Sequence, residues 1–264
     1  MLTHRRAGFT PRPLTRAAVV LTVAALALAG CGDGGTGNSG STLTVLAASS
    51  LTDAFGELET TYESDHSDVD VELSFDSSST LAEQVVQGAP ADVLATADED
   101  TMQSVVDEGL TDGDPVGFAQ NQLSLVTPAD NPADIQTIAD LDNPDVDFAV
   151  CIPDAPCGAA TEKLLSIVGV TADPVTEEDN VRDTLGKVTE GEVDAGLVYV
   201  SDAQAAGDDV HVVEVPEADQ VLNSDVIAVL SDADDSEDAQ AWVDLVTSDE
   251  GQQVLKSYGF LPAP

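Results

Sequence analysis

Basic and aromatic residues are scarce in this chain of 264 residues. It has 8 Lys and Arg against 50 Asp and Glu, a formal net charge of −42, and four of the eight bases lie before residue 30, ahead of every acid. A surface that binds nucleic acid needs Lys and Arg to meet the phosphates, so this deficit excludes nucleic acid as a partner. Aromatic residues make up only 4% of the chain, so the core must be built mainly from Val, Leu and Ala.

The acidic excess has two interpretations. High charge with low hydrophobicity is typical of disordered chains, but hydrophobic residues make up 42% of this sequence and recur with helix and strand periods throughout the body. We therefore favour a folded protein whose acidic surface suits high salt, where the short screening length suppresses self-repulsion. A chain of this length can form one large domain or two lobes.

The first 31 residues have the layout of a bacterial export signal. Four arginines precede an apolar run over residues 17–28, which is short for a membrane span. The stretch Leu28-Ala29-Gly30-Cys31 resembles the lipobox of bacterial lipoproteins, in which the signal is cut before the cysteine and the cysteine receives the lipid. An ordinary signal peptide is the alternative. We expect a signal peptide over residues 1–30, a lipid on Cys31, and a flexible Gly/Ser tether over 31–41.

Cysteine is rare in the body, where the sequence has Cys151 and Cys157. An exported protein meets an oxidising compartment, so two cysteines this close predict a small disulfide loop. Free thiols and a metal site are the alternatives. Two sulfurs without a histidine at suitable spacing make a weak metal site.

Strand and helix patterns alternate along the body. A strand pattern is present over residues 43–47, 69–75 and within 88–98, and it restarts after about residue 122, over 122–127, 147–152, 195–200, 210–215 and 225–230. Helical patterns follow over residues 51–62, 81–86, 99–108, 159–168, 177–188, 238–246 and 249–258. This series predicts an α/β protein with largely parallel sheets and helices on both faces, in two lobes joined by crossing strands.

Five segments combine a strand end with neutral hydrogen-bond donors. They are Ser49-Ser50, Ser77-Ser78-Ser79, Cys157-Gly158, Asn180-Val181 and Tyr199. Ligands of open α/β sheets bind at the carboxyl ends of strands, against helix N-termini, where free N–H groups and the helix dipole favour an anion. Helix capping is the alternative, since Ser50 with Asp53 and Thr80 with Glu83 match capping boxes.

Taken together, six motifs resemble the molybdate-binding proteins of bacterial ABC importers. They are AASSLT at 47–52, FDSSSTLA at 75–82, GAPADV at 88–93, DNVR at 179–182, GLVYVSD at 196–202 and YGF at 258–260, and the resemblance spans residues 43–261. It implies a two-lobed periplasmic-binding-protein fold (type II), each lobe a mostly parallel sheet flanked by helices, with the ligand in the interlobe cleft. Lobe 1 would comprise 42–124 plus 222–264, and lobe 2 would comprise 125–221.

The resemblance also implies that the anion is held without a positive side chain. The matching ligand groups are the hydroxyls of Ser50, Ser78 and Tyr199 and the backbone N–H groups of Cys157 and Val181, with Ser49, Ser77 and Ser79 in support. The ligand would be molybdate or tungstate, so the metal enters as an oxyanion, and no cofactor is expected. This chain has Cys157 where the family often has alanine, which leaves open which N–H of that turn donates.

We therefore expect an exported monomer, anchored by lipid to the outer face of the cell membrane, that serves an ABC permease and its ATPase and is not an enzyme. Another tetrahedral oxyanion such as sulfate is the alternative ligand. A serine hydrolase is the alternative class, but the chain lacks a Gly-x-Ser-x-Gly motif, and neither His66 nor His211 follows a strand end at the cleft. Arg182 is expected in a structural salt bridge, and Asp202 as a cap or an acceptor behind the site.

Overall fold

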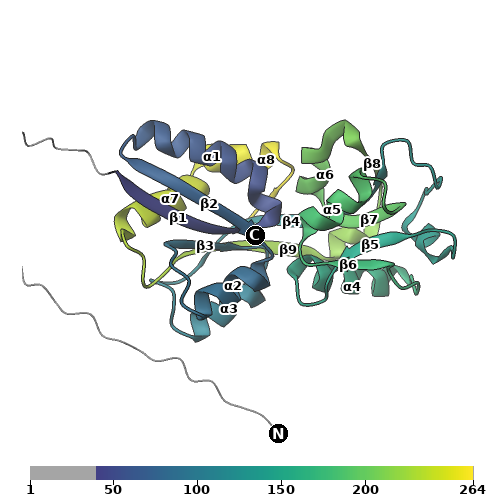
Figure 1. Ribbon diagram of the computed structural model, residues 1–264, viewed down its shortest axis with the longest axis horizontal. Coiled ribbons are helices and arrows are strands. Elements are labelled where there is room, and N and C mark those ends of the chain that lie inside the picture. The colour runs from purple at the N-terminus through teal and green to yellow at the C-terminus, as the bar shows by residue number, and fades with distance from the viewer. Residues whose placement is uncertain (1–39, 264) are drawn as a thin grey trace, which may run out of the picture. The chain divides into compact units, whose positions relative to one another are not determined.

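The computed structural model describes residues 40–263. The predicted signal peptide, the lipidation of Cys31 and nearly all of the predicted tether lie outside these residues. Within residues 40–263, no helix combines the length and the apolar composition that a membrane span requires. This part of the chain forms two halves joined by long strands (Figure 1).

One half, which we call lobe 1, is a sheet between two layers of helices. β1 (Ser41–Ala48) lies between β2 (Val69–Asp76) and β3 (Val93–Thr96), parallel to both, and β9 (Leu222–Val229) runs antiparallel beside β3. Its helices are α1 (Thr52–Asp65), α7 (Ser236–Thr247) and α8 (Asp249–Ser257) on one face and α2 (Ser78–Val86) and α3 (Glu99–Asp107) on the other (Figure 1). Successive side chains of a strand alternate between faces, so Val45 packs under α1 and Leu46 packs under α2.

The other half, lobe 2, repeats this design. β5 (Phe148–Cys151) lies between β6 (Thr176–Glu178) and β7 (Ala195–Tyr199), parallel to both. The helices of lobe 2 are α4 (Pro156–Val168), α5 (Val181–Thr189) and α6 (Val200–Ala206), with short 3-10 helices η2 (Ile138–Asp142), η3 (Gly207–Asp209) and η4 (Pro216–Gln220).

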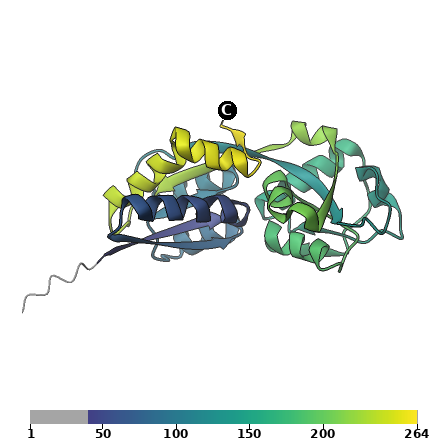
Figure 2. The same ribbon diagram turned by 90° about the horizontal axis from the view of Figure 1, so that it is seen from above.

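Strand β4 (Val116–Pro128) belongs to both halves, as Figure 2 shows. Its first part pairs antiparallel with β9 in lobe 1, and its second part pairs with β7 and β8 (Val210–Val213) in lobe 2. The short β10 (Leu261–Pro262) also pairs with β4. The strand order β2-β1-β3-β9-β4-β7-β5-β6 confirms the predicted α/β class with crossing strands between two lobes.

Each lobe has its own hydrophobic core. The core of lobe 2 uses buried side chains from residues 123–221, and the two cores of lobe 1 use residues 43–119 and 226–260. Trp242 is fully buried in lobe 1, where its ring centroid lies 5.6 Å from that of Phe55. Because the cores are separate, the residues of β4 and β9 between them carry the connection.

The predicted capping box of Thr80 and Glu83 is wrong. α2 begins at Ser78, three residues before the predicted start, so Thr80 already lies within the helix. Ser77 takes the N-cap position, but its hydroxyl bonds to the Ser79 hydroxyl at 2.9 Å and not to a backbone N–H. The first N–H groups of α2 are therefore not taken up by a capping side chain.

Two other predicted helix starts also differ. Residues Thr176–Glu178 form the short edge strand β6, which pairs with β5, so the helix predicted over 177–188 begins only at Val181. Ser50 and Asp53 form no capping box either, because Ser50 lies in the 3-10 helix η1 (Ser49–Leu51), and Asp53 pairs with a residue of lobe 2.

Candidate functional site

A small cavity lies where the two lobes meet. Its lining residues from lobe 1 are Ala48, Ser49, Ser50, Asp76, Ser77, Ser78 and Ala97, and those from lobe 2 are Pro156, Cys157, Asn180, Val181 and Tyr199. All five predicted ligand residues are in this set, together with Ser49 and Ser77, whereas Ser79 is not. The space open to the centre of a water-sized sphere is about 10 Å³, roughly enough for one water molecule, and residues of both lobes line it.

Two serines of lobe 1 present hydroxyls to the cavity. Ser50 follows β1, is 3% exposed, and has no hydrogen-bond partner for its Oγ among the described residues. Ser78 follows β2, is 1% exposed, and its Oγ accepts the N–H of Ala97 at 2.9 Å. That bond uses the Ser78 oxygen as an acceptor, so its proton stays free to donate to a ligand.

The turn around Ser78 is held by its neighbours. The N–H of Ser77 donates to the carboxylate of Asp76 at 2.7 Å, and the Ser77 and Ser79 hydroxyls bond to each other at 2.9 Å. Asp76 also lines the cavity, and this bond keeps its carboxylate engaged with the backbone. Ser77 and Ser79 thus support the turn through a bond that uses one of their two hydroxyl protons, whereas the Ser78 hydroxyl donates to no described residue.

The start of α5 leaves one backbone donor outside its cap. The Asn180 side chain accepts the N–H groups of Arg182 at 3.0 Å and Asp183 at 3.1 Å. These are the second and third N–H groups of the helix, so the cap does not use the first, which belongs to Val181, a residue that lines the cavity. A carboxylate or other anion at this position would also meet the positive end of the helix dipole.

The start of α4 also leaves a backbone N–H without a capping partner, here because of a proline. Its first residue is Pro156, which has no N–H, and Ala155 at the N-cap provides no capping side chain. The first available N–H of the helix is therefore that of Cys157, which lines the cavity. The next residue of α4, Gly158, has no room for a side chain, because a Cβ there would lie 1.9 Å from the Ile152 carbonyl oxygen.

A disulfide joins Cys151 at the end of β5 to Cys157 in α4, with the Cα atoms 5.8 Å apart. This is the pairing that the sequence predicts. It ties the carboxyl end of the strand to the helix N-terminus that faces the cavity, so it restrains the position of the Cys157 N–H.

Tyr199, the last residue of β7, provides the third hydroxyl. It is 1% exposed, and its Oη has no hydrogen-bond partner among the described residues. Burial, followed by the charge of Asp225, raises the pKa of Tyr199 well above its usual value of 10. The phenol therefore stays neutral and can donate its proton to a ligand.

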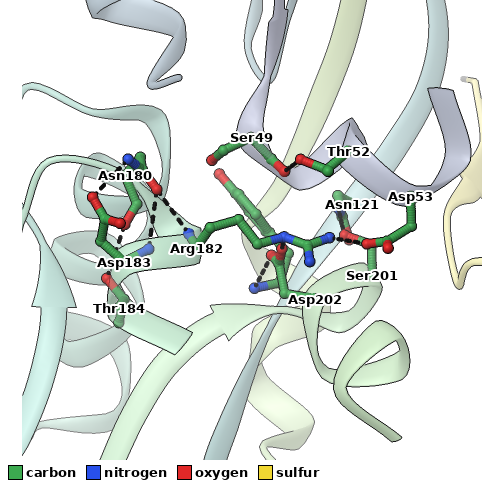
Figure 3. Close-up of polar contacts among 11 residues, drawn as sticks. Ser49, Thr52, Asp53, Asn121, Asn180, Arg182, Asp183, Thr184, Ser201 and Asp202 are labelled. Atoms are coloured by element: carbon green, nitrogen blue, oxygen red, sulfur yellow. Dashed lines mark hydrogen bonds and ion pairs between the residues drawn. The ribbon is translucent and has the colours of Figure 1, made fainter. Parts of the chain in front are cut away.

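The positive charges near the cavity lie outside it. The described residues that line it include no Lys, Arg or His. Arg182, next to Val181, turns away to form ion pairs with Asp53 of lobe 1 and Asp202 of lobe 2 (Figure 3). Asp202 is fully buried and accepts the N–H of Tyr199 at 3.2 Å. These contacts confirm the predicted salt bridge of Arg182 and the predicted acceptor role of Asp202.

A larger cleft of about 230 Å³ lies nearby, between α3 and α4, and shares Pro156 with the cavity. Its wall carries three acids, Asp98, Glu99 and Asp100, with Lys163 opposite. This acidic wall does not suit an anion. The small cavity, with its convergent neutral donors, is the candidate site.

Comparison with known proteins agrees with this geometry. A family model described as bacterial extracellular solute-binding protein matches residues 43–261. The molybdate-binding protein ModA of Mycobacterium tuberculosis is 42% identical over 218 residues, which cover 83% of this chain and 84% of that protein.

Solved structures share the fold. The periplasmic molybdate-binding protein of Azotobacter vinelandii superimposes with a TM-score of 0.73 at 17% identity, covering 84% of this chain and 100% of that one. The sulfate-binding protein SubI of Mycobacterium tuberculosis has a TM-score of 0.74 at 20% identity, covering 84% and 87%. Proteins named for two different oxyanions therefore share this fold, so the fold alone does not select the anion.

Proposed function

The chain belongs to the family of bacterial extracellular solute-binding proteins, and from that premise we propose that it captures molybdate and delivers it to an ABC permease. The observation that supports this best is the cavity between the lobes, where three hydroxyls and two helix N-termini converge. The 42% identity to a molybdate-binding protein favours molybdate over other oxyanions.

We assign the binding of the anion to five donors: the hydroxyls of Ser50, Ser78 and Tyr199 and the N–H groups of Cys157 and Val181. Each of these groups is a donor that its neighbours leave free. Hydrogen bonds to a charged partner are about twice as strong as neutral ones, so a set of neutral donors can bind a dianion. Ser49, Ser77 and Ser79 support the two lobe 1 turns.

Neutral donors also suit a protein of such negative charge. The net charge of −42 repels anions at long range, and salt screens this repulsion beyond about 10 Å at ionic strengths near 0.1 M. The hydroxyls and helix N-termini act at contact distance, where screening is weak. We infer that salt assists the approach of the anion, while the local dipoles hold it.

We propose that the lobes close on the anion as rigid bodies. The division into 42–124 with 222–264 and 125–221 is supported in outline by the separate cores, which change over between residues 221 and 226 on β9 and between 119 and 123 on β4, slightly before the predicted boundary. Donors from both lobes face one cavity, so closure brings the full set together.

Outside the described residues, we propose export and a lipid on Cys31, which would tether a monomeric carrier beside its permease and ATPase. Cys31→Ala should move the protein from the membrane fraction to the soluble fraction. We also propose that the protein is not an enzyme, so replacing both His66 and His211 should leave anion capture intact.

Calorimetry with molybdate, tungstate, sulfate and phosphate tests the central proposal. We expect molybdate and tungstate to bind and sulfate and phosphate to bind far more weakly. Binding of sulfate without molybdate would overturn the assignment of the ligand while leaving the site. No binding of any tetrahedral oxyanion would overturn the site as well.

A further inference from the structure

We propose that Asp53 and Arg182 form a latch that holds the two lobes closed, so that this ion pair sets how fast a bound anion leaves. The inference rests on the proposed function, because it assigns a role to residues beside the same cavity. Neither side chain lines the cavity, so both act as positioning residues.

The two partners sit on the segments that supply donors from opposite lobes. Asp53 is the second residue of α1, three positions after Ser50. Arg182 is the second residue of α5, directly after Val181. The ion pair between them therefore joins the lobe 1 segment that carries one ligand hydroxyl to the lobe 2 segment that carries one ligand N–H (Figure 3).

Arg182 is anchored on its own lobe, which makes the latch one-sided. Its Nε lies 2.8 Å from Oδ1 of the buried Asp202, and the other carboxylate oxygen of Asp202 accepts the N–H of Tyr199. The planar guanidinium has donors on separate edges, so Nη2 remains available for Asp53. Because Asp202 already orders the guanidinium, closure has to immobilise only the short Asp53 side chain.

The pair is also placed so that it can open. The Arg182 side chain is 26% exposed and the Asp53 side chain is 40% exposed, so water and salt reach both. Exposed ion pairs of this kind stabilise weakly and respond to ionic strength. A contact of modest strength at the rim can delay the departure of a ligand without preventing its release.

Among the ion pairs of residues 40–263, this is the one that joins the lobes. Arg182–Asp202 and Lys187–Glu192 both lie within lobe 2. Neutral interlobe contacts are also present, such as the hydrogen bond from Asn121 to Ser201 at 2.8 Å. Asn121 belongs to the connecting strand β4, so that bond lies at the connection between the lobes, whereas the Asp53–Arg182 pair joins α1 to α5.

Charge alone predicts the opposite effect of removing Asp53. A carboxylate near an anion repels it, so Asp53→Asn should strengthen anion binding if the pair has no latching role. The latch predicts weaker binding from faster release. The sign of the change therefore separates the two explanations.

The test compares the purified wild-type protein with Asp53→Asn and with Glu192→Gln, a matched control that removes one negative charge and one ion pair within lobe 2. Association and dissociation rates for molybdate are measured at low and high salt. We expect Asp53→Asn to raise the dissociation rate about fivefold, equivalent to about 1 kcal/mol at about 1.4 kcal/mol per tenfold, without slowing association. The control should match the wild type, and high salt should shrink the difference.

A second measurement does not depend on the identity of the anion. Amide hydrogen exchange, without added anion, should be faster in Asp53→Asn around residues 48–52 and 180–183, and unchanged in Glu192→Gln, while the melting temperature of the variant stays close to that of the wild type. Unchanged exchange and unchanged or slower dissociation in Asp53→Asn would overturn the latch. If exchange is faster in Asp53→Asn as predicted but the wild-type protein binds no molybdate, the latch stands and the proposed function is overturned.

Discussion

Replacing Asp202 with asparagine should change how the stability of this fold depends on pH. Asp202 is fully buried beside Arg182 and accepts the N–H of Tyr199. Burial raises the pKa of Asp202 from 3.8 to about 6, although the charge of Arg182 and the Tyr199 N–H act in the opposite direction. The folded protein therefore keeps a proton on Asp202 at pH values where the unfolded chain has lost it.

The sign and size of the effect follow from this shift. A group whose pKa rises on folding contributes stability that is fully present below its unfolded pKa and is lost as the pH rises through its folded pKa. The rise from 3.8 to about 6 corresponds to roughly 3 kcal/mol at about 1.4 kcal/mol per pKa unit. Asparagine does not titrate, so Asp202→Asn lacks this dependence.

Denaturant unfolding at a series of pH values measures the effect. The free energy of unfolding of the wild type minus that of Asp202→Asn should fall by roughly 3 kcal/mol between about pH 4 and about pH 7. Asp142→Asn is a control of opposite sign, because the N–H groups of Thr171 and Ala172 lower the pKa of Asp142, so its contribution is lost as the pH falls. A difference for Asp202 that stays constant or grows with pH would mean that Arg182 outweighs burial, and would refute the reasoning.

Three further predictions concern the site and its support. Ser78→Ala should raise the Kd for molybdate about tenfold or more, since a hydrogen bond to a charged group contributes about 1.5–3 kcal/mol. Ser79 lies outside the cavity, so Ser79→Ala should change the Kd little. Equal losses of affinity in the two variants, measured by calorimetry, would contradict the assignment. Reducing the Cys151–Cys157 disulfide should weaken molybdate binding several-fold and lower the melting temperature, and the double variant Cys151→Ser, Cys157→Ala should not respond to reductant. Gly158→Ala should destabilise the fold by more than about 3 kcal/mol through the clash with Ile152, whereas Gly186→Ala, with open space around it in α5, should be neutral or stabilising when thermal melting compares the two.

Much of this architecture could be predicted because it depends on local patterns. The alternation of Val69 and Val71 with polar neighbours predicts β2, and the hydroxyl run after it marks a strand end that meets a helix N-terminus. The pairing of Cys151 with Cys157 follows from their short separation. These features need only neighbours in sequence.

The errors arose where a distant contact decides the outcome. Thr80 loses the predicted capping role because α2 starts earlier, at Ser78, whose hydroxyl bonds to the N–H of Ala97, 19 residues away. Asp53 matches a capping pattern with Ser50, yet it pairs with Arg182, 129 residues away. Local sequence carries no signal for such a contact.

The burial of Asp225 could not be predicted from the sequence for the same reason. It is fully buried on β9 without a hydrogen-bond partner for its carboxyl oxygens among the described residues, and burial raises its pKa well above 3.8. In the sequence it is one acid among 50. Only the packing of β9 against its neighbours distinguishes it from the others.

The strands that connect the lobes limit the motion available to them. β4 and β9 are hydrogen-bonded to each other from Val116 to Gln122, and both continue toward the other lobe. Sliding one strand along the other would break this register, while twisting and bending the pair leave it intact. The lobes are therefore free to twist and bend about this two-stranded ribbon but not to slide past each other.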